Sequence, residues 1–231
     1  MRNGSVVLWC AACAAGAMAL AGCTGQATRV SIEGDGAAGP VAKSPEDYRK
    51  VRFAEAMRGL AIRDGLVRVD AEAAGELALN LRPADGAGAI ARGESRLAEN
   101  DFSGAVAEYR TAILADAGSA AGYEGLGDAL VCKRKDDMAL AAYRTAVMLA
   151  PRDADARMKL AETLNRNGDI AGWAAELENV LAIDGGHGEA HARLAVARYY
   201  LGDKEAAREE IVLAERFGGA VPPQLRDLVN N

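Results

Sequence analysis

Two histidines four residues apart are the first candidates for chemistry in this sequence. His187 and His191 are the only histidines of the 231-residue chain, and this spacing can place two imidazoles on one helix face, where they could ligate zinc. A zinc site needs further ligands, and no cysteine lies near the pair in sequence. A hydrolase would also need a nucleophile and an oxyanion site, which no motif supplies. We therefore expect both histidines to be surface residues.

Two other features could bind or react. Cys132 is flanked by Lys133 and Arg134, cations that favour a reactive thiolate, but no histidine lies near it, and we expect it to be a small packing residue. Residues 34–39 read Gly-Asp-Gly-Ala-Ala-Gly and match the dinucleotide fingerprint, which works only between a strand and a helix; Pro40 follows at once. The sequence thus predicts no enzyme, no cofactor, no metal site and no small-molecule substrate.

The first 23 residues have the pattern of an export signal. Arg2 carries the single charge, residues 5–21 are uncharged, and the stretch ends in Leu20-Ala21-Gly22-Cys23. The uncharged run is shorter than the roughly 20 residues of a membrane-spanning helix, and it ends in small residues as cleaved signals do. This end resembles the lipobox of bacterial lipoproteins, which implies removal of residues 1–22 and lipidation of Cys23. An ordinary signal peptide with a chance cysteine is the alternative.

The resemblance to Gram-negative lipoproteins also implies a location. Thr24 follows the cysteine, and in that class a residue other than aspartate favours the outer membrane over the inner one. Several acyl chains on Cys23 would hold the protein firmly, since single chains bind only marginally. We therefore expect a protein anchored on the periplasmic face of the outer membrane, with residues 23–43 as lipid anchor and flexible Gly/Ala/Ser-rich tether.

A repeat of 34 residues runs through the rest of the chain. Four series keep this interval: Gly93, Gly127, Ala161 and Ala195; Ala105, Ala139, Trp173 and Ala207; Tyr109, Tyr143, Leu177 and Ile211; Ala112, Ala146, Val180 and Ala214. The period and its small-residue pattern resemble the tetratricopeptide-repeat (TPR) family. The resemblance implies an all-α, right-handed superhelical solenoid of helix hairpins. Trp173 departs from the pattern at a normally small position, and we expect it to pack in a widened inter-repeat space; a role in binding is the alternative.

The repeat phase predicts the domain organisation. Residues 86–219 are expected to form four TPR units, and residues 220–231 a C-terminal capping helix. Gly59, Ala71, Ala78 and Pro83 extend the phase upstream, with Pro83 as a helix stop. Residues 44–85 are therefore predicted to be a degenerate N-terminal helical pair, as terminal repeats often are.

The TPR resemblance also implies a binding surface, because first helices of successive TPR units line a concave groove. The inward positions would be Ile90, Glu94, Leu97, Glu124, Asp128, Val131, Asp155, Met158, Glu162, Asn165, Glu189, Val196, Tyr199 and Tyr200. This set is acidic, with an apolar strip, two tyrosines at one end and no basic residue expected before Arg166. Charge complementarity predicts that it binds a basic or amphipathic protein segment. The alternative is a row of merely solvated helix positions.

The order of signal, cysteine, tether, repeats and a Val221-Pro222-Pro223 tail resembles the TadD family, the TPR lipoproteins of Tad/Flp pilus assembly. The resemblance implies a non-enzymatic scaffold that assists assembly of an envelope machine, in the manner of a pilotin at a pilus secretin. A TPR scaffold for outer-membrane protein insertion or cell-wall synthesis is the alternative. A net charge of -6 argues against nucleic acid as a partner, since a duplex binder shows a basic face.

Overall fold

The computed structural model describes residues 45–75 and 81–230. The expected signal segment 1–22, the expected lipid site Cys23 and the expected tether 23–43 lie outside the described residues. Within the part that is described, no helix is both long and apolar enough to cross a membrane.

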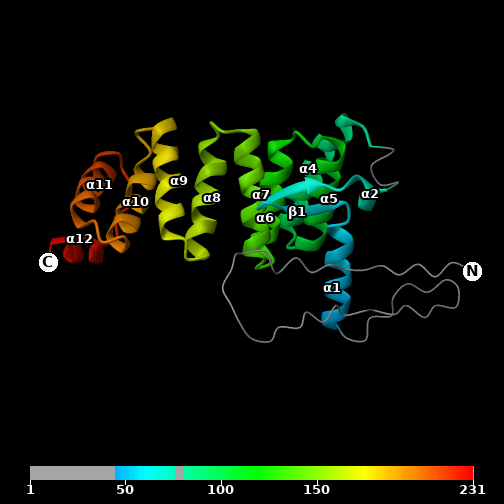
Figure 1. The fold of residues 1–231 in the computed structure, drawn as a ribbon, viewed down its shortest axis with the longest axis horizontal. Helices are drawn as coiled ribbons and strands as arrows, with labels where there is room; N and C mark the ends of the chain where they lie inside the picture. The colour runs from blue at the N-terminus through cyan, green and yellow to red at the C-terminus, as the bar shows by residue number, and fades with distance from the viewer. Residues whose placement is uncertain (1–44, 76–80, 231) are drawn as a thin grey trace, which may run out of the picture. The chain divides into compact units, whose positions relative to one another are not determined.

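Helices α4 to α11 lie in four consecutive antiparallel pairs, which follow one another in sequence order (Figure 1). We number these pairs units 1 to 4. They are α4 (Pro83–Ala98) with α5 (Phe102–Ala115), α6 (Ala120–Cys132) with α7 (Asp136–Leu149), α8 (Ala154–Arg166) with α9 (Ile170–Ile183), and α10 (Gly188–Tyr200) with α11 (Lys204–Arg216). A last helix, α12 (Pro223–Asn230), follows unit 4. Each unit thus repeats the helix hairpin that the 34-residue period predicts.

The turn inside each unit has the same backbone conformation at 34-residue intervals. The residues with positive φ in these turns are Asn100, Arg134, Gly168 and Gly202. A left-handed residue ends a helix by bringing the next N–H back to its last carbonyls, and Asp101, for example, donates its N–H to Arg96 O at 2.8 Å. The side chain of Asp101 then accepts from Gly104 N and begins the second helix. Asp169 and Asp203 do the same in units 3 and 4.

The two helices of units 1 and 2 pair closely because a tyrosine ring of the second helix packs against the backbone of a glycine in the first. A Cβ added to Gly93 would lie 2.8 Å from Tyr109 Cζ, and one added to Gly127 would lie 2.5 Å from Tyr143 Cε1. Such distances are far below van der Waals contact, so glycine is required opposite each ring. Units 3 and 4 have alanine with a smaller partner at these positions: Ala161 with Leu177 and Ala195 with Ile211.

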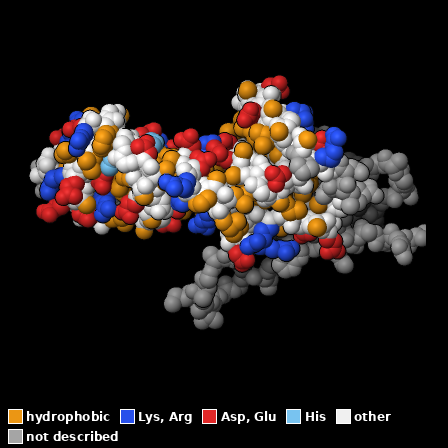
Figure 2. Space-filling view, turned by 90° about the horizontal axis from the view of Figure 1, so that it is seen from above, with side chains coloured by type: hydrophobic (Ala, Val, Ile, Leu, Met, Phe, Trp, Pro, Cys, Tyr) orange, Lys and Arg blue, Asp and Glu red, His pale blue; other side chains and the backbone are white. Residues whose placement is uncertain are grey.

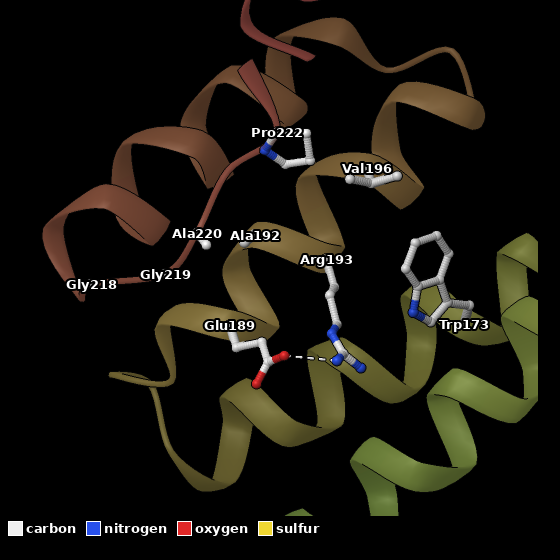
Figure 3. Close-up of a pocket in the computed structure, with 9 residues that line it drawn as sticks. All are labelled: Trp173, Glu189, Ala192, Arg193, Val196, Gly218, Gly219, Ala220 and Pro222. Carbon is white, nitrogen blue, oxygen red and sulfur yellow. Dashed lines mark hydrogen bonds and ion pairs between the residues drawn. The ribbon is translucent and has the colours of Figure 1, made fainter. Parts of the chain in front are cut away.

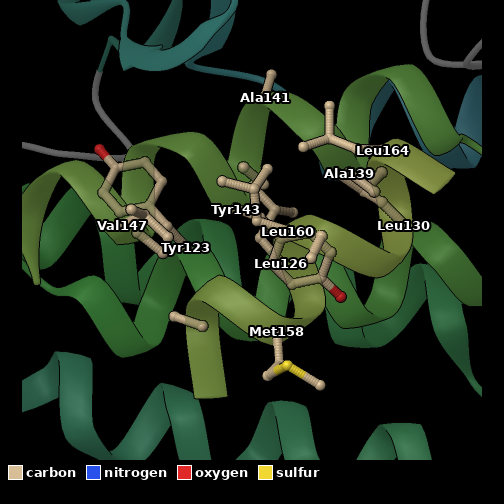
Figure 4. Close-up of a cluster of buried hydrophobic side chains, with 14 of the residues drawn as sticks. Tyr123, Leu126, Leu130, Ala139, Ala141, Tyr143, Val147, Met158, Leu160 and Leu164 are labelled. Carbon is tan, nitrogen blue, oxygen red and sulfur yellow. The ribbon is translucent and has the colours of Figure 1, made fainter. Parts of the chain in front are cut away.

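A continuous apolar core connects the units. Its central part combines side chains of three helices, including Leu126 of α6, Tyr143 of α7 and Leu160 of α8 (Figure 4). A second cluster lies at the C-terminal end, where Leu225 and Val229 of α12 join Ile211 and Ala214. Helix α12 therefore covers the apolar face that unit 4 would otherwise expose, as a capping element must in a repeat protein.

The prediction of a helical pair over residues 44–85 is wrong in its second half. Helix α1 (Pro45–Ala56) is followed by an antiparallel hairpin of β1 (Leu60–Arg63) and β2 (Leu66–Val69), and then by the short α2 (Ala71–Ala74). The connecting residues Asp64 and Gly65 have φ of 55° and 71°. Positive φ at both positions is typical of a type I′ turn, for which Asp-Gly is a favoured pair. Pro83 is likewise not a helix stop, because α4 begins there.

The hairpin is tied to unit 2 by one buried hydrogen bond. Val67 N, in β2, donates to Thr145 Oγ1 of α7 at 2.9 Å, and Val67 is only 2% exposed. Thr145 Oγ1 itself donates to Ala141 O, so this hydroxyl has both roles filled. The hairpin thus packs on α7 as a small β-element, where a repeat unit was expected.

Candidate protein-binding face

The residues predicted to bind protein lie on α4, α6, α8 and α10, the first helices of the four units. We call this surface the first-helix face. Glu94, Asp155, Asn165, Glu189 and Tyr200 are exposed on it. Glu124, Asp128, Val131, Glu162, Val196 and Tyr199 are half-buried, as are Ile90 and Leu97, which pack against the core. Met158 is buried at 8% exposure and is a core residue, so its prediction as a contact residue is wrong.

Lys159 corrects the expectation that no basic residue precedes Arg166. Its Nζ lies 2.6 Å from Glu124 Oε1 and 2.8 Å from Asp128 Oδ2, so it joins α8 to α6 across the unit boundary. Tyr143 donates its hydroxyl to the other oxygen of Asp128 at 2.7 Å. Two of the acidic side chains are therefore partly committed to holding neighbouring units together.

The same arrangement recurs one unit later. Arg193 lies 34 residues after Lys159 and forms ion pairs with Glu162 of α8 and with Glu189 of its own helix, the latter at 2.7 Å. Glu162 in turn lies 34 residues after Asp128. An acid on one first helix and a base on the next thus form an inter-unit ladder. The ladder could have been predicted from the sequence, because its acids and its bases recur at the same 34-residue interval as the apolar residues.

These contacts set the protonation of the groups involved. Burial opposes the charged form of Lys159, but its hydrogen bonds to Asp128 and Glu124 outweigh that effect and raise the pKa of Lys159. Burial, followed by the charge and hydrogen bond of Asp128, raises the pKa of Tyr143. Burial, with Glu94 and Asp128 nearby, raises the pKa of Tyr109 to about 12. All three groups keep their protons at neutral pH.

Even with this ladder, the first-helix face remains acidic. Its predicted residues include six carboxylates, at Glu94, Glu124, Asp128, Asp155, Glu162 and Glu189, against the two cations Lys159 and Arg193. Arg166 is held by Asp136 of α7, at 3.2 Å. Figure 2 shows one side of the molecule, on which acidic and basic side chains are interspersed over the C-terminal units.

The histidines are structural, but only one is placed as expected. His187 caps α10, its Nδ1 accepting from Ala190 N at 3.2 Å. His191 is 6% exposed, with Nδ1 2.6 Å from Glu210 Oε2 and its ring stacked on Phe217, so the expectation of a surface residue is wrong. Arg157 and Glu176 form the equivalent pair one unit earlier, and this 34-residue shift could have identified the partner.

Cys132 is the remaining candidate within the described residues. Cys132 is exposed, so the expectation of a packing residue is wrong. Among the residues that the structure describes, no group of three or more His, Cys, Asp or Glu side chains could hold a metal ion.

Comparison with solved structures identifies the fold. A crystal structure of MamA superposes with a TM-score of 0.55 at 20% identity, covering 58% of this chain and 78% of that one. MamA of Desulfovibrio magneticus RS-1, from residue 41 to its end, gives a TM-score of 0.53 at 16% identity, covering 58% and 75%. MamA is a helical, TPR-like repeat protein.

The chain has a TPR-type fold. The predicted all-α solenoid is thereby confirmed. No family model and no curated relative matches the sequence. At this level of identity the likeness to MamA concerns the fold alone, and a TPR-type scaffold supports protein partners in general.

Proposed function

We propose that this protein is a lipoprotein scaffold, anchored through Cys23 to the periplasmic face of the outer membrane, that assists assembly of an envelope machine. Its first-helix face would hold a basic, partly apolar segment of a partner protein. The machine we propose is the Tad/Flp pilus system, with the secretin as partner, since the expected order of signal, cysteine, tether and repeats resembles that of its TPR lipoproteins.

The observation that supports this proposal most directly is the distribution of charge over the first-helix face. Glu94 and Asp155 are exposed, and among the described residues neither has a cation within ion-pair distance. The inter-unit ladder itself contains more acids than bases, namely Glu124, Asp128, Glu162 and Glu189 against Lys159 and Arg193. Glu94 and Asp155 add to this excess of negative charge. Exposed unpaired acids do little for folding, but they attract a basic segment over about 10 Å at physiological salt.

The test is capture of partners from the envelope by the full chain with Glu94→Lys and Asp155→Lys. Both positions are exposed, so the thermal midpoint should change little, whereas capture should fall because association slows. Raised salt should weaken the wild-type protein in the same way. The matched control is Glu209→Lys on α11, an exposed acid on a second helix, which should retain capture.

Lys159→Met provides an independent arm of the same test. It removes the cation between Glu124 and Asp128 and makes the face more acidic, so a basic partner should associate faster even though the fold is somewhat less stable. The proposal is contradicted if Glu209→Lys loses partners while the Glu94/Asp155 variant keeps them. If a secretin is captured, the pilus role is supported. Capture of outer-membrane insertion or cell-wall synthesis proteins would favour the other scaffold role.

A further inference from the structure

Trp173 interrupts one of the 34-residue series of small residues in the fold. Ala105, Ala139 and Ala207 hold this position in the other units and are fully buried. The much larger indole is 4% exposed and lies where α8, α9 and α10 meet. Two clefts adjoin it, of about 370 and 310 Å³, and Trp173 and Arg193 line both. The space is comparable to that of a pocket for a large side chain.

The walls of the larger cleft are mainly apolar, and one of them, the segment before α12, is held in a fixed position. Ala192 and Val196 of α10 face Ala220 and Pro222 of the segment before α12 (Figure 3). That segment is fixed because its backbone touches α10: a Cβ on Gly219 would overlap Gly188 O. The cleft is therefore built into the backbone of unit 4 and would not be closed by a simple side-chain rotation.

The indole supplies a hydrogen-bond donor that the described fold does not use. Trp173 Nε1 is buried and donates to no acceptor among the described residues, although a buried indole N–H normally has one. In Figure 3 the nitrogen edge of the ring is turned toward the side of the cleft on which Arg193 lies. A carbonyl oxygen brought in by a bound chain would satisfy this donor once it displaced the side chains that cover the nitrogen.

The rim of the larger cleft is anionic in its accessible part, whereas the smaller cleft is also lined by Arg166, which pairs with Asp136. Arg193 is held between Glu162 and Glu189, and its side chain is 29% exposed, against 43% and 61% for the two carboxylates. A segment entering here therefore meets carboxylate oxygens before it meets the guanidinium. Lysine or arginine side chains next to the inserted residue would complement this rim.

We propose that the cleft beside Trp173 is the anchor point of the bound partner: it takes one large apolar side chain of an extended segment, whose neighbouring lysine or arginine contacts Glu162 and Glu189. This inference rests on the proposed protein-binding role of the first-helix face. It adds the position of the anchor and the kind of residue that fills it. Buried anchors in pockets carry most of the affinity of protein interfaces.

The first experiment selects random dodecapeptides on the full-length protein. We expect enrichment of peptides with one large apolar residue beside lysine or arginine. Ala220→Phe fills the cleft from an exposed wall position and should weaken the selected peptides by at least about tenfold, with loss of the apolar preference. The control is Ala175→Phe, an exposed position on α9 that does not line either cleft, and it should bind as the wild type does.

A second experiment observes the cleft directly. The chain has two tryptophans, Trp9 and Trp173, so in full-length Trp9→Phe protein the emission comes from Trp173 alone. A selected peptide should change this emission saturably, and the same peptide with its apolar residue replaced by alanine should do so only at much higher concentration. In Trp9→Phe/Ala220→Phe protein the peptide should have little effect.

The outcomes separate this inference from the proposed function. Selection of basic peptides without an apolar residue, or unchanged binding to Ala220→Phe, would overturn the anchor and leave the acidic face standing. Selection of no peptides, or of acidic ones, would overturn both. If Trp173 emission depends on protein concentration without any peptide, a second copy of the chain fills the cleft, and the anchor for a foreign segment is overturned.

Discussion

At the scale of single residues, the fold depends on matched sizes within each unit. Tyr143 needs a bare backbone at Gly127, just as Tyr109 needs one at Gly93. Tyr109 also lies on Gly125 of the next unit, where an added Cβ would be 2.1 Å from its ring. Glycine destabilises a helix interior by about 0.5–1 kcal/mol relative to alanine. Its presence at these positions is explained by the tyrosine rings that pack against it.

Gly127→Ala should lower the free energy of unfolding by about 1–3 kcal/mol, because the new methyl overlaps Tyr143. Adding Tyr143→Leu should recover part of this loss, since the pair then matches Ala161 and Leu177 of unit 3. Urea denaturation of the two single variants and the double variant measures the coupling. Gly88→Ala, at an exposed site in α4, is the control and should be neutral or stabilising. Additive losses in the double variant would contradict the packing described.

Stability should fall between pH 10 and 12. The pKa of Tyr109 is about 12 in the folded chain against 10 for the free side chain, so in this range the unfolded state loses a proton that the folded state keeps. The contribution of Tyr109 is thus complete below pH 10 and declines by about 1.4 kcal/mol per pH unit above it. Urea midpoints at pH 9, 10 and 11 should decline less for Tyr109→Phe. Parallel curves for the two proteins would show that Tyr109 is not buried as described.

At the scale of elements, the N-terminal hairpin shows how a local turn overrides a repeat pattern. Gly59, Ala71 and Pro83 fit the 34-residue phase, yet Asp64-Gly65 forms a turn with positive φ at both residues, which no helix interior accommodates. Leu60-Ala-Ile-Arg and Leu66-Val-Arg-Val flank that turn. The signal for a hairpin was therefore in the sequence, and the repeat phase concealed it.

Thr145→Val should destabilise the protein by about 1–3 kcal/mol, because Val67 N loses its acceptor while it remains buried. Thr111 is the matched control, since it lies 34 residues earlier and its hydroxyl likewise donates to the carbonyl four residues back, at Ala107. Thr111→Val should cost much less. Equal losses in the two variants would mean that the hairpin contact contributes nothing. Hydrogen exchange at Val67 should increase in Thr145→Val alone.

At the scale of the whole molecule, the proposed role combines an anchor, a tether and an array of units. The array presents the first-helix face, and α12 covers its C-terminal end. Consecutive units are joined by the apolar core, and units 2 to 4 also by the ion-pair ladder of Lys159 and Arg193. In the proposed role, acids of this face both hold units together and attract a basic partner.

Cys23→Ser should abolish labelling by palmitate and release the protein from the outer-membrane fraction, because the thiol that would carry the lipid is gone. Labelled cells and sucrose-gradient fractions provide the measurement. Cys132→Ser is the control, since Cys132 is an exposed cysteine of α6, and it should keep both lipid and location. Recovery of Cys23→Ser in the outer membrane at the wild-type level would refute the anchor.

The sequence by itself determined the repeat, the helix pairs and their order. These follow from short-range rules: small residues where helices approach, large ones at a constant phase, and turns that recur every 34 residues, as at Asn100 and Gly202. The sequence also indicated which helices form the first-helix face. These features occur at the same phase in all four units, so the repeat pattern is sufficient to identify them.

Only the tertiary structure decided the contacts that cross between units. The pairing of Lys159 with Glu124 and Asp128, the burial of Met158 and His191, and the cleft beside Trp173 depend on how neighbouring helices approach. A long charged side chain can reach several partners from one helix position. A single bulky residue displaces its neighbours by a distance that the repeat period does not predict. These contacts belong to pairs of helices, and helix spacing is set by the packing of the whole array.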